Sequence, residues 1–390
     1  METSFKKDFA YAMTPLKILA WPMGTWPLQE YNVASDLRTI VTVFILMYLD
    51  GRDAEKNLDC TGLVSCTILA IWKVMQFRFR RDDLVSNFQS AAKDYKELDS
   101  EEKRAVMRRH AYMGRMAGAS VIFTAFFSAT LIAIVPMVTS GKEETTLDGN
   151  ATTAGNMHYP LHSEYTLQVL HVPDSLFPLI FILQYQMMLV IGNGSDAVFF
   201  GITFHLCGQA EILKLEFTKI VNDNENTARR FDTLTARHRH LLMLSKQLND
   251  TISSILVVQL FSSCLLICTT GENFLHLYSA KTFLVVTTIL AQLFAYSYVG
   301  DYLKEQMEGV GYSAYCCWWY DLPEHLSKDI IFILMRAQDP VNLKAGESFV
   351  VNMETYMSIL KTSMSYLSVL RIMITTISQT KAEFNAMKIT

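Results

Sequence analysis

The segment KTSMSYLSVLRIM, from Lys361 to Met373, is the polar exception in a 390-residue chain that otherwise has the pattern of a membrane protein. With its flanks it is long enough to cross a bilayer, which requires about 20 residues. It nevertheless contains a lysine, an arginine and several hydroxyl groups. Polar side chains at membrane depth normally face protein or water. We therefore expect this segment to be a membrane-spanning helix whose polar side chains avoid lipid.

The composition supports a membrane protein with sizeable polar loops. Hydrophobic residues make up 51% of the chain and charged residues 18%, against about 25% charged in an average soluble domain. The mean hydropathy is +0.19. A net charge of −4 does not indicate a nucleic-acid-binding protein. Segments near the required length occur at 33–50, 60–77, 117–139, 176–206, 252–274, 281–300 and, more weakly, 350–376.

The lysines and arginines of the loops predict the orientation, because they are enriched on the cytoplasmic side. With the N-terminus inside, the cytoplasmic loops hold 25 of them and the outer side holds 7. The sequence thus predicts an all-α membrane protein with seven transmembrane helices, a cytoplasmic N-terminus and an extracellular C-terminus. Asn150 begins a glycosylation sequon in the long outer loop, where it could be modified. No secretory signal peptide is expected in residues 1–32.

Seven spans also invite comparison with G-protein-coupled receptors. Of the seven cysteines, only Cys60 is predicted near the outer face, so an outward disulfide framework is not indicated. The last span lacks the Asn-Pro aromatic signature of rhodopsin-like receptors, and the predicted topology is inverted relative to theirs. A metabotropic seven-helix receptor remains the alternative. A transporter would favour internal repeats or paired broken helices, which the sequence does not indicate.

Four sequence segments carry a family resemblance. They are RAQDPVNLKAGESFVVNMETYMSILKTSMSYLSVLRIM at the C-terminal end, SDAVFFGITFHLCGQAEILKLEF, AQLFAYSYVGDYLKEQ and AYCCWWYDLP. Together with length, span number and orientation, they resemble the insect odorant receptors. The Thr-Tyr and Gln-Phe signature of the related gustatory receptors is absent, although that family stays an alternative. The loop 208–250 is shorter than the corresponding loop of the co-receptor subunit, so the chain resembles a ligand-tuned subunit.

The resemblance implies a heteromeric, non-selective cation channel. In such a channel this chain and the odorant receptor co-receptor form a tetramer in the plasma membrane of olfactory sensory neuron dendrites. A small volatile odorant opens a pore that conducts monovalent and divalent cations, and membrane lipid surrounds the helices. No enzyme activity, cofactor, metal site or nucleic-acid partner is expected.

The last span would line this pore. Helical steps of three and four place one stripe along it, formed by Ser358, Thr362, Ser365, Val369 and Met373. The stripe is rich in hydroxyls at its cytoplasmic end and apolar at its outer end, which suits a wet vestibule closed by an apolar ring. Alternatively, the hydroxyls bond to neighbouring helices. Lys361 and Arg371 lie a quarter turn or more off the stripe, and we expect a structural role for Arg371.

The resemblance places the odorant pocket in the outer halves of spans two, three, four and six. Such pockets are largely hydrophobic, with a few polar groups that orient the ligand. The candidate positions carry no charge, which predicts a neutral ligand; ordinary helix packing is the competing explanation for each of them. They are Thr67, Ile71, Phe127, Thr130, Ile134, Tyr185, Met188, Thr287 and Thr288.

The cytoplasmic part before the last span contains an amphipathic pattern. Pro323 suits a first helical turn, the apolar positions recur at helical spacing from Leu326 to Ala337, and Asp339-Pro340 ends the run. The resemblance implies that this helix belongs to an anchor that joins subunits; an interfacial helix on lipid is the alternative. Asp196 is expected to be a paired structural acid. The chain thus divides into segments 1–32, 33–300 (ligand-binding part), 301–349 (anchor region), 350–376 (pore-lining span) and 377–390 (extracellular tail).

Overall fold

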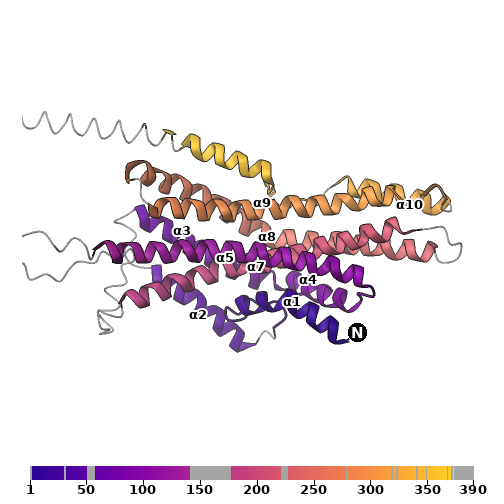
Figure 1. Ribbon diagram of the computed structural model, residues 1–390, viewed down its shortest axis with the longest axis horizontal. Helices are drawn as coiled ribbons and strands as arrows, with labels where there is room; N and C mark the ends of the chain where they lie inside the picture. Colours follow the sequence, from indigo (N-terminus) through magenta and orange to yellow (C-terminus); the bar gives the residue numbers. More distant parts are fainter. Residues whose placement is uncertain are drawn as a thin grey trace, which may run out of the picture.

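The chain folds into a bundle of long helices in the computed structural model (Figure 1). The described residues are 2–29, 32–50, 58–140, 177–220, 227–277, 280–317, 319–321, 324–339, 341–347, 349–366, 368–369 and 372. Asn150, Pro323, Arg371 and Met373 lie outside them.

Six of the predicted spans coincide with helices, and the seventh is helical over its described residues from 353 onward. Four of the helices continue well beyond the predicted span. They are α5 (Glu101–Ser140), α7 (Phe177–Thr218), α8 (Thr227–Leu277) and α9 (Ala280–Tyr315). At 1.5 Å per residue a 40-residue helix is about 60 Å long, roughly twice the thickness of the hydrocarbon core. Among the described residues these same four helices are long and apolar enough to cross a membrane.

The extra length forms a second half of the bundle, which carries most of the charge. The first turns of α5 and α8 hold the runs EEKR and TARR, and α9 continues past its apolar part as GDYLKEQ. The short helices α1 (Glu2–Ala20), α4 (Arg81–Lys96) and α10 (Glu324–Ala337) lie at this end, whereas α2 (Val33–Asp50) and α3 (Leu58–Phe79) extend toward the other (Figure 1). Charged side chains are disfavoured in lipid, so this end of the bundle is expected to lie outside the hydrocarbon core.

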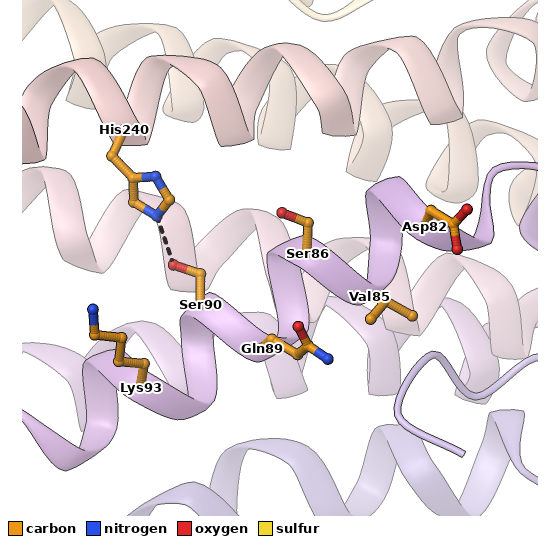
Figure 2. A pocket seen from close by; sticks show the side chains of 7 residues that line it. All are labelled: Asp82, Val85, Ser86, Gln89, Ser90, Lys93 and His240. Carbon is orange, nitrogen blue, oxygen red and sulfur yellow. Dashed lines mark hydrogen bonds between the residues drawn. The ribbon is translucent and has the colours of Figure 1, made fainter. Parts of the chain in front are cut away.

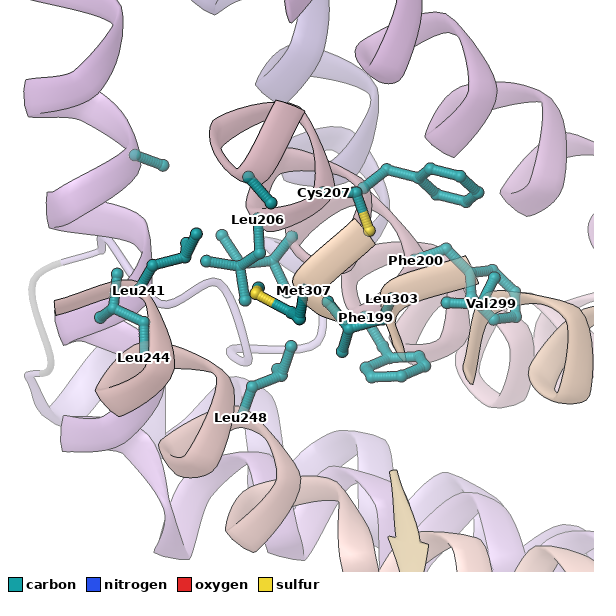
Figure 3. Packing of buried hydrophobic residues seen from close by; sticks show 14 of the residues in the cluster. Phe199, Phe200, Leu206, Cys207, Leu241, Leu244, Leu248, Val299, Leu303 and Met307 are labelled. Atoms are coloured by element: carbon teal, nitrogen blue, oxygen red, sulfur yellow. The ribbon is translucent and has the colours of Figure 1, made fainter. Parts of the chain in front are cut away.

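Helix α7 forms the centre of the bundle. Its apolar window is 78% buried, and it packs against α1, α3, α5, α8 and α9. Small residues allow α5 and α7 to approach each other closely. A Cβ added at Gly118 of α5 would lie 3.0 Å from the Cβ of Ala197 on α7. The core continues into the charged half, where Leu206, Leu244 and Met307 of three helices interlock (Figure 3).

The predicted amphipathic helix is confirmed as α10. Leu326, Ile330 and Ile333 are buried at 2–3% exposure, and the helix packs on α9. Its opposite face leaves Phe332 and Met335 more than 60% exposed. That exposed face could pack against another subunit, as the predicted anchor role would require.

Two local elements were not predicted from the sequence. Residues 2–20 form α1 in spite of Pro15, and this helix places Leu16 against Gly201 of α7. The chain is also not purely helical, because β1 (Lys344–Ala345) and β2 (Phe349–Val350) make a small antiparallel hairpin. Gly346 turns this hairpin with a positive φ of 67°, which favours glycine. The last helix follows directly, over residues 353–366.

Candidate functional site

A buried ion pair joins α3 to α7 in the apolar half of the bundle. Lys73 Nζ lies 2.7 Å from Asp196 Oδ1, and both side chains are 1% exposed. The same ammonium donates to the carbonyl oxygen of Gly192 at 3.4 Å. Removing one partner of such a pair leaves an uncompensated buried charge, which costs about 3–5 kcal/mol. The pair therefore fixes α3 against α7, and Asp196 is a paired acid as the sequence predicted.

Polar side chains of α8 and α9 complete this ion pair. Tyr296 donates its hydroxyl to Asp196 at 2.5 Å, and the Gln292 amide donates to Asp196 at 2.6 Å and to Asn193 at 3.3 Å. Gln259 of α8 in turn donates to the Gln292 carbonyl oxygen at 3.2 Å. We call this group the polar centre; it consists of Lys73, Asn193, Asp196, Gln259, Gln292 and Tyr296. Sequence reasoning missed all of it except Asp196, because the partners of Asp196 on α3 and α9 lie about 100 or more residues away from it.

Three of the predicted pocket positions lie within two turns of the polar centre, Thr67 and Ile71 on α3 and Thr288 on α9. Thr67 is buried, and Ile71 packs on a small apolar cluster that includes Val74. Thr288 is one turn from Gln292, and its hydroxyl lies 2.5 Å from that of Ser128 on α5. This brings α5 and α9 together around neutral polar groups.

A second contact connects α5 to α7. Thr130 accepts a hydrogen bond from the Gln186 amide at 2.8 Å, and Thr130 itself donates to the carbonyl oxygen of Phe126. Ser128 and Gln186 were not predicted. Their signal was a hydroxyl and an amide inside apolar spans, where polar groups face protein or water.

Other predicted pocket positions are not brought into the interior. Phe127 is 52% exposed and stacks on exposed Phe123 with ring centroids 6.0 Å apart. Thr287 is also exposed, and its hydroxyl bonds to the carbonyl oxygen of Phe283. Phe127 and Thr287 therefore do not line a pocket that this chain encloses by itself. Helix α5 turns the neighbouring Ser128 inward, and α9 turns the neighbouring Thr288 inward. The side chains of Ile134, Tyr185 and Met188 lie outside the described part.

The last helix presents its predicted stripe away from its own bundle. Ser363 is fully buried, with its hydroxyl 3.7 Å from the Cys264 sulfur, and Tyr356 packs edge-on against Phe294. These residues mark the face toward the bundle.

Ser358, Thr362, Ser365 and Val369 are all exposed, Val369 at 52%. A helical wheel at 100° per residue places all four between about 100° and 160° from Ser363. Lys361 is exposed as well. The stripe is thus free to face a pore or a neighbouring subunit.

Helix α9 also holds the beginning of the last helix. The Asp301 carboxylate accepts the backbone N–H of Met353 at 2.8 Å, in the first turn of that helix. Asn352 caps the same turn by accepting the N–H of Thr355 at 2.7 Å. At Gly300, a side chain would collide with the carbonyl oxygen of Val351, so this position requires glycine. We call these contacts of Gly300 and Asp301 the clamp; the sequence did not predict it.

A separate groove of about 430 Å³ lies between α4 and α8, in the charged half (Figure 2). His240 Nε2 and the Ser90 hydroxyl are 3.0 Å apart across it. Its other lining residues are Asp82, Val85, Ser86, Gln89 and Lys93. A site for a small apolar ligand is mostly hydrophobic, so this charged, open groove does not suit one.

One buried histidine in the charged half has a shifted pKa. Burial, helped by the positive charge of Arg336, lowers the pKa of His238 to about 4. The side chain is 3% exposed and therefore neutral at physiological pH.

Comparison with known proteins agrees with this architecture. The family model described as 7tm Odorant receptor matches residues 54–364. Odorant receptor 10 of Aedes albopictus is 24% identical, over 38% of this chain and 41% of that protein. Odorant receptor 67a of Drosophila melanogaster is 27% identical over 45% of each chain. The odorant receptor coreceptor of Drosophila melanogaster is 24% identical over 34% of this chain and 29% of its own. The chain thus spans less than half the length of these curated relatives.

Solved structures share the fold over nearly the whole chain. The olfactory receptor OR5 from Machilis hrabei has a TM-score of 0.74 at 14% identity, covering 92% of this chain and 97% of that one. The same receptor in complex with eugenol has a TM-score of 0.73 at 13% identity, covering 94% and 100%. With the family model matching most of the sequence, the chain belongs to the insect 7tm odorant receptor family.

Proposed function

We propose that this chain is an odorant-tuned subunit of a heteromeric, non-selective cation channel, assembled with the odorant receptor co-receptor in the plasma membrane of olfactory sensory neuron dendrites. The observation that carries the proposal is the last helix, whose hydroxyl-rich stripe is exposed on the side opposite its own bundle. Lipid is a poor environment for such a stripe, whereas a water-filled pore shared with other subunits accommodates it.

The ligand of this channel is a small neutral volatile. The groups available beside the polar centre are hydroxyls and an amide, from Thr67, Ser128, Thr130, Gln186 and Thr288. The nearby charges of Lys73 and Asp196 are engaged with each other. One solved relative of this fold is described in complex with eugenol, a neutral phenol, which is in keeping with this ligand class.

The orientation follows from the charged half of the bundle. Water-accessible charged ends and the excess of Lys and Arg both favour a cytoplasmic location for the half that contains α1, α4 and α10. The C-terminus is then extracellular, with Asn150 in an outer loop. In intact cells, a C-terminal tag should be reached by antibody and an N-terminal tag should not. The reverse pattern would contradict this orientation.

The function is tested by expressing the chain with the co-receptor and applying neutral volatiles: C6–C10 alcohols, esters, and phenols including eugenol. We expect at least one to evoke a cation current that neither subunit gives alone. A current evoked only by organic acids or amines would contradict the neutral pocket. Odorant-dependent G-protein signalling by the chain alone, without current, would favour the metabotropic alternative.

A further inference from the structure

One face of α9 touches the predicted pocket, the polar centre and the clamp in turn. Thr288, Gln292, Tyr296 and Gly300 follow at intervals of four residues, so they lie along one side of the helix. Thr288 contacts Ser128 at the pocket, and Gly300 lies against the start of the last helix. The distance from Thr288 to Gly300 along the axis is about 18 Å. A single helix therefore connects the predicted pocket to the start of the last helix, whose far end carries the proposed gate.

The middle of this connection is tightly packed. The Tyr296 ring is 1% exposed and packs against both Phe199 and Phe200 of α7, with ring centroids 5.7 Å and 5.2 Å away. Interiors packed at this density transmit a displacement instead of absorbing it. A shift of α9 at Thr288 would thus reach Asp301 and the last helix.

Gln292 is the point at which such a shift must break or exchange a hydrogen bond. Its amide nitrogen donates to Asp196 and Asn193 of α7, and its carbonyl oxygen accepts from Gln259 of α8. The Gln259 carbonyl oxygen is buried and has no hydrogen-bond partner among the described residues. This oxygen is an alternative acceptor for the Gln292 amide, so the polar centre offers two arrangements.

We propose that Gln292 is a positioning residue for gating: it couples odorant occupancy beside Thr288 to the clamp on the last helix by exchanging its amide between Asp196 and Gln259. The odorant itself does not contact Gln292. This inference rests on the proposed channel function and adds the route by which the pocket acts on the pore.

The test replaces Gln292 by methionine, which keeps an unbranched side chain of similar size but removes both hydrogen-bonding groups. The matched control is Gln306→Met, because Gln306 is a largely buried glutamine of the same helix, beyond the clamp, that accepts from Lys214. Both variants are expressed with the co-receptor at matched surface levels. The probe is the panel member that gives the largest current with the unmodified chain.

Current and binding are measured separately. For Gln292→Met we expect the evoked current per surface receptor to fall about tenfold, the effect of losing hydrogen bonds to a charged group. The dissociation constant of the same panel member, from its concentration-dependent thermal shift of the purified complex, should stay within about twofold. Gln306→Met should change neither quantity.

A second variant shows whether the pore itself still works. In the double variant Gln292→Met/Val369→Ser, the ligand-free leak expected from Val369→Ser should persist while the evoked current is lost. An unchanged evoked current in Gln292→Met would overturn the coupling role. A loss of odorant binding as large as the loss of current would overturn it as well, because Gln292 would then act in the pocket or in folding of the chain. If the unmodified chain with the co-receptor gives no current, the proposed channel function is wrong, and the coupling role falls with it. If the unmodified chain gives a current and Gln292→Met gives the same current, only the coupling role is wrong.

Discussion

The polar centre and the stripe of the last helix both place polar side chains in predicted membrane spans, but they differ in what satisfies them. In the polar centre Lys73 and Tyr296 both bond to Asp196, and each of the three side chains is 1% exposed. On the stripe Thr362 and Ser365 are exposed and point away from their own bundle. Polar groups satisfied within the chain hold the fold together. Polar groups that the chain leaves exposed require water or another subunit, and they indicate where it functions.

The largest expected effect comes from breaking the polar centre. Lys73→Met leaves the Asp196 carboxylate buried without its cation, which should destabilise the chain by about 3–5 kcal/mol. We expect surface biotinylation to show strongly reduced delivery to the membrane.

Lys361→Met is the matched control, because Lys361 is exposed on the last helix. It should leave the surface level unchanged. Equal delivery of the two variants would show that the buried pair does not hold the fold together.

The next effect concerns the stripe. Replacing Val369 or Met373 by serine should stabilise water in the closed pore and raise the ligand-free leak current. A shift of about 1.4 kcal/mol in the closed state changes the open-to-closed ratio tenfold. The leak is recorded with the co-receptor present and at matched surface levels.

Leu367→Ser and Leu370→Ser are the comparison, since both positions lie off the stripe by a quarter turn or more. They should disturb packing and surface expression without raising the leak. Unchanged leak and ion selectivity at both stripe positions, with expression intact, would remove the stripe from the gate.

The smallest effect lies in the charged half. The pKa of His238 is about 4 in the folded chain, against about 6.5 in the unfolded chain. The unfolded chain therefore binds the proton first, and stability falls as the pH drops below 6.5. Between pH 7.5 and pH 6.0 the expected loss is about 0.8 kcal/mol.

Thermal unfolding of the purified complex at these two pH values measures this loss, and His238→Leu should reduce it. His240→Leu is the control, because His240 lies on an exposed face of the same helix. A pH dependence that survives in His238→Leu would assign the effect to other groups.

The sequence predicted the helices better than their ends. Apolar length alone located the six helices that hold the spans predicted between residues 33 and 300, because a bilayer demands about 20 apolar residues. It could not show that α5, α7, α8 and α9 continue past their apolar segments, since charged residues occur in both helices and loops outside lipid. Helix α1 was not predicted, because a search for spans of about 20 apolar residues does not find a helix that lies outside them.

The site was predicted less completely, for a physical reason. The polar nature and helical stripe of the last span are local features, visible in a single segment. The polar centre and the clamp depend on pairs such as Lys73 with Asp196 and Gly300 with Val351, which are distant in sequence and meet only through packing. Phe127 and Ser128 show the limit clearly. Adjacent residues take opposite faces of α5, and the sequence does not say which face is inside.

The central claim, that the stripe of the last helix lines the ion path, is tested most directly by cysteine accessibility. Thr362→Cys, Ser365→Cys and Leu370→Cys are expressed with the co-receptor and exposed to a charged, membrane-impermeant thiol reagent during odorant stimulation. The unmodified chain is treated with the same reagent as the control, because it contains seven cysteines of its own. The account predicts that the reagent reduces the evoked current at Thr362 and Ser365 but not at Leu370. Modification of the current at Leu370 alone, or at none of the three positions with normal surface expression, would contradict it.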